Sequence, residues 1–218
     1  MPELPEVETV RRGLQPFLSG ARIRKVDLRR PDLRFPLPPD FARRLTGASV
    51  DALGRRGKYL FATLSTGETL IMHLGMSGRF TVTGAAVRRQ PGEFHFAGST
   101  DPAHDHVAID VTGPQGPARV TYNDPRRFGF MDLEDTMTLD RSRHFAGMGP
   151  EPFDEGFTAA SLKASLTGRK APLKAALLDQ AVVAGLGNIY VCEALWRSGL
   201  SPRRQAGRLS VASAGRLH

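Results

Sequence analysis

Hydrophobic positions at the start of the chain repeat with the period of a helix. The apolar residues that share one helical face are Val7, Val10, Leu14, Phe17 and Leu18. Pro5 and the neighbouring glutamates suit a first helical turn, because proline loses no hydrogen bond there and carboxylates interact favourably with the helix dipole. The pattern predicts an amphipathic N-terminal helix that stops at Gly20.

From Ala21 to Leu133 the pattern changes to short apolar runs. The runs predicted as strands are Ala21–Leu28, Ser49–Leu53, Tyr59–Leu64, Thr69–Leu74, Arg79–Thr83, His106–Val111, Arg119–Tyr122 and Phe128–Leu133. Gly, Pro, Asn and Asp separate these runs, which favours an antiparallel sandwich or barrel over βαβ units. The stretch Gly84–Asp105 has no clear period and is predicted as a long surface loop.

Helical periodicity returns after Gly149. The predicted helices are Thr158–Leu166, Pro172–Val183 and Ile189–Arg197. A glycine-rich turn over residues 185–188 separates the last two, and Asn188 is a natural N-cap there. Ser210–His218 resembles the start of another helix. We therefore expect a domain boundary near residue 150 and an α+β fold.

Composition narrows the class of protein. The chain has 218 residues, 40% hydrophobic and 24% charged, which suits a globular core. A net charge of +8 makes nucleic acid the leading acidic partner, with a genomic bias toward arginine as the alternative. One cysteine, Cys192, excludes an internal disulfide or multi-cysteine zinc site. No apolar run approaches about 18 residues and no signal peptide is evident, so we expect a soluble, cytoplasmic protein.

Pro2 is the first candidate for chemistry. Removal of Met1 would leave a secondary amine whose pKa of about 8 gives a useful neutral fraction at neutral pH. Such an amine can attack an aldehyde carbon and form an iminium. Glu3 and Glu6 are close by in sequence and could transfer protons. The alternative is that these residues only begin a helix, and from these residues alone that alternative is the stronger one.

Further candidates lie at turns between the predicted strands. Lys58 is a primary amine in an arginine-rich chain, where it fits proton transfer or a basic turn that faces phosphate. Met76 and Phe128 lie on glycine-flanked turns, and Arg126 precedes Phe128. They fit wedges in a base stack with a hydrogen-bonding arginine, or ordinary hairpins with core side chains. The segment His104–His106 fits phosphate contact at least as well as metal binding.

Several motifs, taken in their order, resemble the bacterial formamidopyrimidine-DNA glycosylase family. They are Pro2–Thr9, Lys58–Leu60, His73–Gly78, Asp124–Gly129, Leu178–Gln180 and Gly187–Tyr190. The likeness covers essentially the whole chain. It implies an N-terminal helix with a two-layer antiparallel β-sandwich in residues 1–150, and a helix–two-turn–helix DNA-binding domain in residues 151–218. The periodicity independently agrees with this fold.

The resemblance implies a base-excision-repair enzyme, a DNA glycosylase and AP lyase that removes 8-oxoguanine and formamidopyrimidines from duplex DNA. The target base must be flipped out of the stack to expose its glycosidic carbon. By this likeness Pro2 attacks C1′ and holds the sugar as an iminium. Glu3 is similar to the proton donor, with Glu6 beside it, and Lys58 to the acid in strand cleavage by β-elimination. A δ-elimination then leaves a one-nucleoside gap.

The resemblance also assigns DNA contacts. Met76, Arg126 and Phe128 match residues that fill the void left by the flipped base, with Arg126 facing the orphaned cytosine. The residues that match contacts to the DNA around the lesion are His73, His104, Lys170, Lys174, Asn188 and Tyr190. These contacts predict strongly salt-dependent binding to damaged double-stranded DNA. The family resemblance also implies a monomer that acts on DNA in the bacterial cytoplasm.

The family normally continues into a four-cysteine zinc finger that grips DNA and carries an arginine implicated in δ-elimination. The chain ends at His218, so we expect no metal ligand and no cofactor within residues 1–218. One alternative is a truncated or non-catalytic relative that binds damaged DNA, but such a protein has no need for Pro2, Glu3, Glu6 and Lys58 together. A sandwich-fold RNA binder would need exposed stacking aromatics, and aromatic residues are only 7% of the chain.

Overall fold

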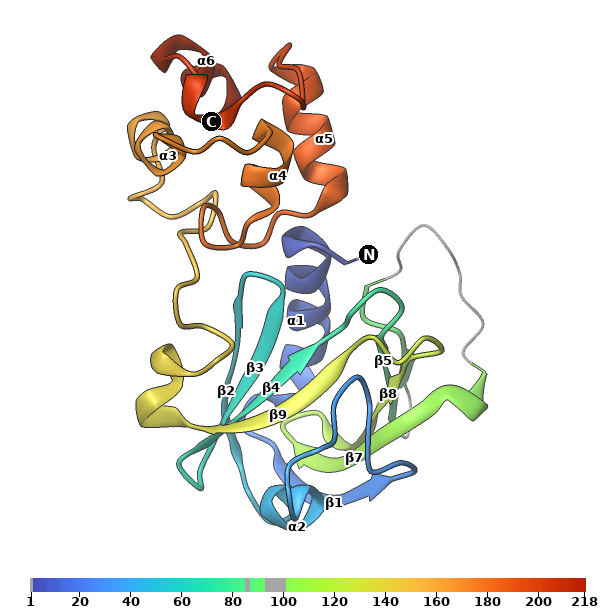
Figure 1. The fold of residues 1–218 in the computed structure, drawn as a ribbon. Helices are drawn as coiled ribbons and strands as arrows, with labels where there is room; N and C mark the ends of the chain where they lie inside the picture. Colours follow the sequence, from blue (N-terminus) through green and yellow to red (C-terminus); the bar gives the residue numbers. More distant parts are fainter. Residues whose placement is uncertain (1, 85–86, 93–100) are drawn as a thin grey trace. The chain divides into compact units, whose positions relative to one another are not determined.

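The computed structural model describes residues 2–84, 87–92 and 101–218 (Figure 1). Contacts divide the chain into two compact units, Met1–Ser142 and Arg143–His218. The sequence placed a boundary near residue 150. Each unit has a hydrophobic core of its own.

The first unit contains helix α1 and two antiparallel sheets, as the sequence predicted (Figure 1). One sheet has the strand order β1-β7-β8-β5-β6 and the other has the order β2-β3-β4-β9. The strands are β1 (Arg22–Leu28), β2 (Val50–Arg56), β3 (Tyr59–Leu64), β4 (Glu68–His73), β5 (Arg79–Gly84), β6 (Val87–Arg89), β7 (Asp105–Gly113), β8 (Gly116–Asn123) and β9 (Phe130–Asp135). Alternating residues of β3 are buried, which is the pattern of a strand with one face in a core.

Helix α1 (Leu4–Leu18) packs against β2 and β3 of one sheet and β7 of the other. Its buried residues are Leu4, Val7, Val10, Leu14, Phe17 and Leu18, which include the full apolar face predicted from the sequence. Full burial of a valine or leucine side chain contributes about 1.5–3 kcal/mol, so this face fixes the helix on the sheets. The helix thereby sets the position of its N-terminal turn.

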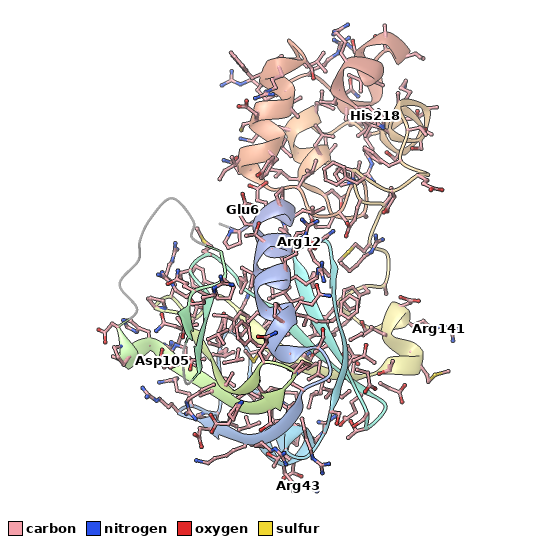
Figure 2. All side chains as sticks on the ribbon, turned by 180° about the vertical axis from the view of Figure 1, so that it is seen from behind. Glu6, Arg12, Arg43, Asp105, Arg141 and His218 are labelled. Atoms are coloured by element: carbon pink, nitrogen blue, oxygen red, sulfur yellow. The ribbon has the colours of Figure 1, made fainter. Side chains whose placement is uncertain are left out.

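The polar side of α1 is tied to strand β2 through Glu8. The Glu8 carboxylate accepts hydrogen bonds from Arg11 at 2.8 Å and Arg12 at 2.8 Å, both on the same helix. Arg55 of β2 donates to Glu8 at 3.3 Å and to the Gly57 carbonyl at 3.0 Å. Figure 2 shows Arg12 on the helix, with Glu6 nearer its N-terminus. The Glu8–Arg55 pair therefore connects α1 to the turn that follows β2.

The second unit is helical. Its helices are α3 (Ala159–Leu166), α4 (Leu173–Leu178), α5 (Asn188–Arg197) and α6 (Val211–Leu217). Apolar residues from all four helices form its core. Ser210 caps α6 by accepting a hydrogen bond from the Ser213 amide, at the place where the sequence indicated a further helix. Among the described residues, no helix is long and apolar enough to cross a membrane.

Several predicted boundaries were wrong. The helix predicted over Pro172–Val183 stops at Leu178, because the Asp179 carboxylate accepts a hydrogen bond from the Ala181 amide at 3.0 Å and starts a turn. The N-cap of α5 is Gly187, so Asn188 is the first helical residue and not the cap.

The predicted loop Gly84–Asp105 also contains regular structure. Strand β6 pairs with β5, and a short 3₁₀ helix occupies Pro102–His104. Residues 85, 86 and 93–100 of this stretch lie outside the described residues. Helix α2 (Phe41–Leu45) and a 3₁₀ helix over Thr136–Arg141 were not predicted, because such short elements display no readable period.

The Glu8 pairs make a testable contribution to stability. Its arginine partners lower the pKa of Glu8 from 4.5 to about 2. A depressed carboxyl pKa stabilises the folded state fully above about pH 4.5, and this stabilisation is lost as the pH falls toward 2. We expect Glu8→Gln to reduce the free energy of unfolding at pH 7 by about 1–2 kcal/mol, after allowance for solvent screening. Urea unfolding at pH 7 and pH 3 measures this.

Asp27→Asn is the matched control, because Asp27 also pairs with two cations, Lys25 and Arg119, but on the exposed surface of β1. We expect Asp27→Asn to lose much less free energy of unfolding at pH 7 than Glu8→Gln does. Equal losses in the two variants at pH 7, or an unchanged gap between wild type and Glu8→Gln at pH 3, would contradict this account.

Candidate functional site

The N-terminal residues Pro2 and Glu3 are buried, with Glu3 only 1% exposed. Glu3 has extended backbone angles and forms the N-cap of α1. Its amide donates to the Glu6 carboxylate at 3.0 Å, one half of a capping box. Glu6 is therefore held by the helix end, and Glu3, the residue that follows Pro2, is buried.

Lys58 lies in the two-residue turn between β2 and β3. Gly57, the other turn residue, has a φ of 56°, a value that β-hairpin turns require and that glycine adopts without strain. Arg55 fixes this turn through its hydrogen bond to the Gly57 carbonyl. The turn is therefore attached to α1 through Glu8.

The structure brings Glu3 and Lys58 into electrostatic range of each other. Burial lowers the pKa of the Lys58 ammonium below its usual value, and the negative charge of Glu3 opposes part of that shift. A buried carboxyl and a half-buried amine thus lie beside the N-terminal segment. A carboxyl group and an amine are side chains that can transfer protons, which is the chemistry predicted for Glu3 and Lys58.

His73 lies in a row of aromatic rings that spans three strands. Strand pairing sets Tyr59 opposite His73 and His73 opposite Phe130. The His73 ring stacks on Phe130 at a centroid distance of 5.3 Å and lies 5.0 Å from Tyr59. The Nδ1 atom of His73 accepts a hydrogen bond from the Gly75 amide at 3.1 Å. His73 therefore supports the loop that follows β4.

Strand pairing brings three loops to one edge of the first unit. Asn123, at the end of β8, pairs with Arg79 at the start of β5 and with Asp105 at the start of β7. The segments that adjoin these strand ends are Leu74–Gly78, Asp101–His104 and Asp124–Gly129. They carry Met76, His104, Arg126 and Phe128, so the structure gathers most of the DNA-contacting residues predicted in this unit.

Two apolar side chains on these loops are exposed. Met76 and Phe128 are each 43% exposed, although large apolar side chains on a soluble protein are more often covered. The Arg126 guanidinium lies 4.6 Å from the centre of the Phe128 ring in a cation–π contact. This set fits side chains that stack with a planar ligand.

His104 lines a cationic hollow that the sequence did not predict. The other charged residues lining it include Arg29, Arg30 and Arg127, with Asp105 as an acidic member (Figure 2 labels Asp105). Three arginines and two histidines, His104 and His106, line this hollow, and such a set fits a phosphate group. The sequence did not connect these arginines with one another, because Arg29 and Arg127 are far apart along the chain and only the fold brings them together.

In the second unit, Lys170 precedes α4 and Lys174 lies on it. The turn before α5 is organised by Gln180, whose side chain accepts from the Gly185 amide at 2.9 Å and donates to the Leu178 and Leu186 carbonyls at 3.0 Å each. Asn188 is exposed at the first position of α5 and Tyr190 is half-buried. Backbone amides at a helix start can bind an anion.

The single cysteine, Cys192, lies exposed on α5. A structural zinc site of the four-cysteine type requires four thiolates. Residues 1–218 therefore lack the ligands of the four-cysteine zinc finger that the resembling family normally carries.

Family models match both units. The model described as "Formamidopyrimidine-DNA glycosylase N-terminal domain" matches residues 1–131, and the model described as "Formamidopyrimidine-DNA glycosylase H2TH domain" matches residues 148–218. Proteins named formamidopyrimidine-DNA glycosylase share 57% identity over 210 residues in Rhodopseudomonas palustris strain HaA2 and 59% over 215 residues in Methylobacterium sp. strain 4-46. The alignments cover 96% and 98% of this chain and 71% of each relative.

Solved structures give the same result. A complex of Lactococcus lactis Fpg with abasic-site DNA matches with a TM-score of 0.83 and 31% identity, over 99% of this chain and 75% of that one. A complex of a G226P mutant of the same protein with DNA containing Fapy-dG matches with a TM-score of 0.82 and 32% identity, over 100% of this chain and 74% of that one. The comparisons confirm the resemblance drawn from the motifs: the chain belongs to the formamidopyrimidine-DNA glycosylase family.

Proposed function

We propose that this protein is a bifunctional DNA glycosylase and AP lyase that removes 8-oxoguanine and formamidopyrimidines from duplex DNA. The observation that carries the proposal is the burial of Pro2 and Glu3 at the start of α1, with Glu3 in electrostatic range of the Lys58 amine. The solved relatives bound to abasic-site DNA and to Fapy-dG DNA support the substrate class.

Base removal begins at Pro2. Once Met1 is removed, the neutral proline nitrogen attacks C1′ of the flipped nucleotide, and the glycosidic bond breaks with its electrons going to the base. Glu3 supplies the proton that the departing base takes up, and its carboxylate then carries the N–H proton of Pro2 to the ring oxygen. Ring opening then gives an iminium between Pro2 and the sugar. The buried position of Glu3 excludes water from this transfer.

Strand cleavage uses the iminium as an electron sink. It makes the C2′ proton acidic, so transfer of that proton to solvent water forms a double bond and expels the 3′ phosphate in a β-elimination. The Lys58 ammonium neutralises and protonates the departing phosphate oxygen. A second elimination releases the 5′ phosphate and leaves a one-nucleoside gap. The Glu6 carboxylate accepts a hydrogen bond from the Glu3 amide and thereby holds Glu3, the proton donor of the first reaction, in place.

The DNA contacts follow from the loops. Met76 and Phe128 enter the void left by the flipped base, and Arg126, stacked on Phe128, faces the orphaned cytosine. The side chains assigned to the DNA around the lesion are His73, His104, Lys170, Lys174, Asn188 and Tyr190. Because several of these are cationic, binding weakens steeply as the salt concentration rises.

Glu3→Gln separates the two reactions. Glutamine keeps the shape of the side chain but cannot donate a carboxyl proton, so we expect release of 8-oxoguanine from duplex DNA to slow by about 100-fold or more. Cleavage at a pre-formed abasic site needs no base protonation and is expected to fall much less. Single-turnover assays on the two substrates measure both rates.

Glu68→Gln is the matched control, because Glu68 lies on β4 and pairs with Arg44 away from Pro2. It should leave both rates unchanged. Base release by Glu3→Gln at the wild-type rate would overturn the role of Glu3. Salt-dependent DNA binding by the wild type with no base release at all would favour a non-catalytic DNA-binding relative.

The lowered pKa of Lys58 predicts that the rate of strand cleavage falls at alkaline pH. An acid with a depressed pKa loses its proton below the usual pH of 10.5, so cleavage of abasic DNA should decline on an alkaline limb that begins below that pH. In Lys58→Arg this limb should vanish, because arginine stays protonated to about pH 12 or higher. Lys25→Arg, on the exposed edge of β1, should keep it. An unchanged limb in Lys58→Arg would exclude Lys58 as the acid.

A further inference from the structure

Two loops carry the exposed residues assigned to the DNA void. The first loop is Leu74–Gly78, which contains Met76, and the second loop is Asp124–Gly129, which contains Arg126 and Phe128. They follow different strands, β4 and β8, in different sheets. Their side chains can act on the same base step only if the two loops keep a fixed spacing.

The Asp124 carboxylate joins the loops. Asp124 is fully buried. One of its oxygens accepts a hydrogen bond from the Ser77 hydroxyl of the first loop at 2.5 Å and from the Arg126 amide at 3.3 Å. The other oxygen accepts from the Tyr122 hydroxyl at 3.1 Å and from the Gly129 amide at 2.9 Å. One side chain thus receives donors from the first loop, the second loop and strand β8.

The loops also touch through their backbones. A Cβ atom at Gly75, which has a φ of 60°, would overlap with the Phe128 carbonyl and the Gly129 nitrogen. A Cβ atom at Gly78 or Gly129 would overlap with the Tyr122 hydroxyl. The three glycines therefore permit an approach that closes the loops around Asp124 and Tyr122.

The backbone of Asp124 is fixed as well. Its amide donates to the His104 carbonyl at 3.0 Å, and its carbonyl lies 2.9 Å from Nε2 of the buried His106. Arg127, three residues after Asp124, has a φ of 55°, which is an uncommon conformation for a residue with a Cβ atom. Its amide donates to the same Asp124 carbonyl at 3.2 Å. The second loop is thus held in a shape that a free chain would seldom adopt.

The donors around the carboxylate are neutral hydroxyls and amides. Burial, together with the adjacent negative charge of Asp124, raises the pKa of Tyr122 well above its usual value, so the phenol remains a donor. A buried charged acceptor loses much of its stabilisation when one donor is removed. Each of these hydrogen bonds therefore affects the position of both loops.

We propose that Asp124, together with Ser77 and Tyr122, is a positioning group that holds the two loops as one preformed wedge, so that Met76, Arg126 and Phe128 enter the DNA void together. The inference rests on the void-filling role given above. Parting a stacked base step costs free energy, and a wedge that must also be ordered on binding pays a further entropic penalty. A preformed wedge avoids that penalty.

Ser77→Ala and Tyr122→Phe test the proposal, since each removes one hydroxyl donor and leaves the carboxylate in place. Ser77→Thr keeps the hydroxyl and serves as the rescue variant. The matched control is Thr69→Val, which removes a fully buried hydroxyl that pairs with Thr136 at 2.8 Å elsewhere in the same unit. Thermal unfolding shows that each variant is folded and how much stability it loses.

Two readouts separate positioning from stability. The first is the single-turnover rate of 8-oxoguanine release from duplex DNA. It is compared with the rate of cleavage of a single-stranded abasic oligonucleotide, which has no duplex base stack for a wedge to enter. The second is the fluorescence of 2-aminopurine placed beside an abasic site in duplex DNA, which rises when a wedge unstacks it. The fluorescence requires binding only, so it tests the wedge independently of catalysis.

We expect Ser77→Ala and Tyr122→Phe to slow base release from duplex DNA about tenfold and to reduce the fluorescence rise. Cleavage of the single-stranded substrate should stay at the wild-type rate, and Ser77→Thr should recover duplex activity. Thr69→Val should lose stability without either change. If Ser77→Ala and Tyr122→Phe behave like Thr69→Val in both readouts, the positioning role is wrong.

Met76→Ala distinguishes failure of the inference from failure of the proposed function. If Met76→Ala slows base release while Ser77→Ala and Tyr122→Phe match the wild type in both readouts, only the positioning role is overturned. A normal Met76→Ala in both readouts overturns the wedge itself and the inference with it. If the wild type releases no base, the glycosylase proposal fails, and the fluorescence comparison still decides the positioning role.

Discussion

The candidate active site depends on the burial of helix α1 against both sheets. Because Val7, Val10 and Leu14 are covered, the turn at the start of the helix is fixed on the protein, and Pro2 and Glu3 are buried with it. The Glu8–Arg55 pair then attaches the Lys58 turn to the same helix. The proximity of a carboxyl, an amine and the N-terminal proline is thus a consequence of packing.

Long periodic elements were predicted well from the sequence. The face of α1 and the alternation of Leu60, Ala62 and Leu64 in β3 arise from side chains that must be covered, so the pattern reports the fold directly. Elements whose ends or existence depend on a single local or distant contact were not predicted from the sequence. Helix α4 stops at Leu178 through a side-chain hydrogen bond of Asp179, and three-residue β6 exists through its pairing with β5.

The same distinction applies to the site. Motifs that resemble a known family identified Pro2, Lys58 and Phe128 as candidates, and the family is confirmed. The sequence did not show which residues hold these candidates in place, although Glu8, Ser77 and Asp124 lie within the same motifs. Asp124 and its donor Ser77 are 47 positions apart, as are Glu8 and Arg55. A hydrogen bond across such a separation leaves no period, so only the fold reveals it.

The central claim is that the nitrogen of Pro2 forms the covalent bond to the sugar. Borohydride reduction in the presence of duplex DNA with one abasic site, followed by tryptic digestion and mass spectrometry, tests it most directly. We expect an adduct on the peptide Pro2–Arg11, at its N-terminal nitrogen, and none on chains that retain Met1. An adduct on Lys58, or no adduct from DNA-bound protein that has lost Met1, would contradict it.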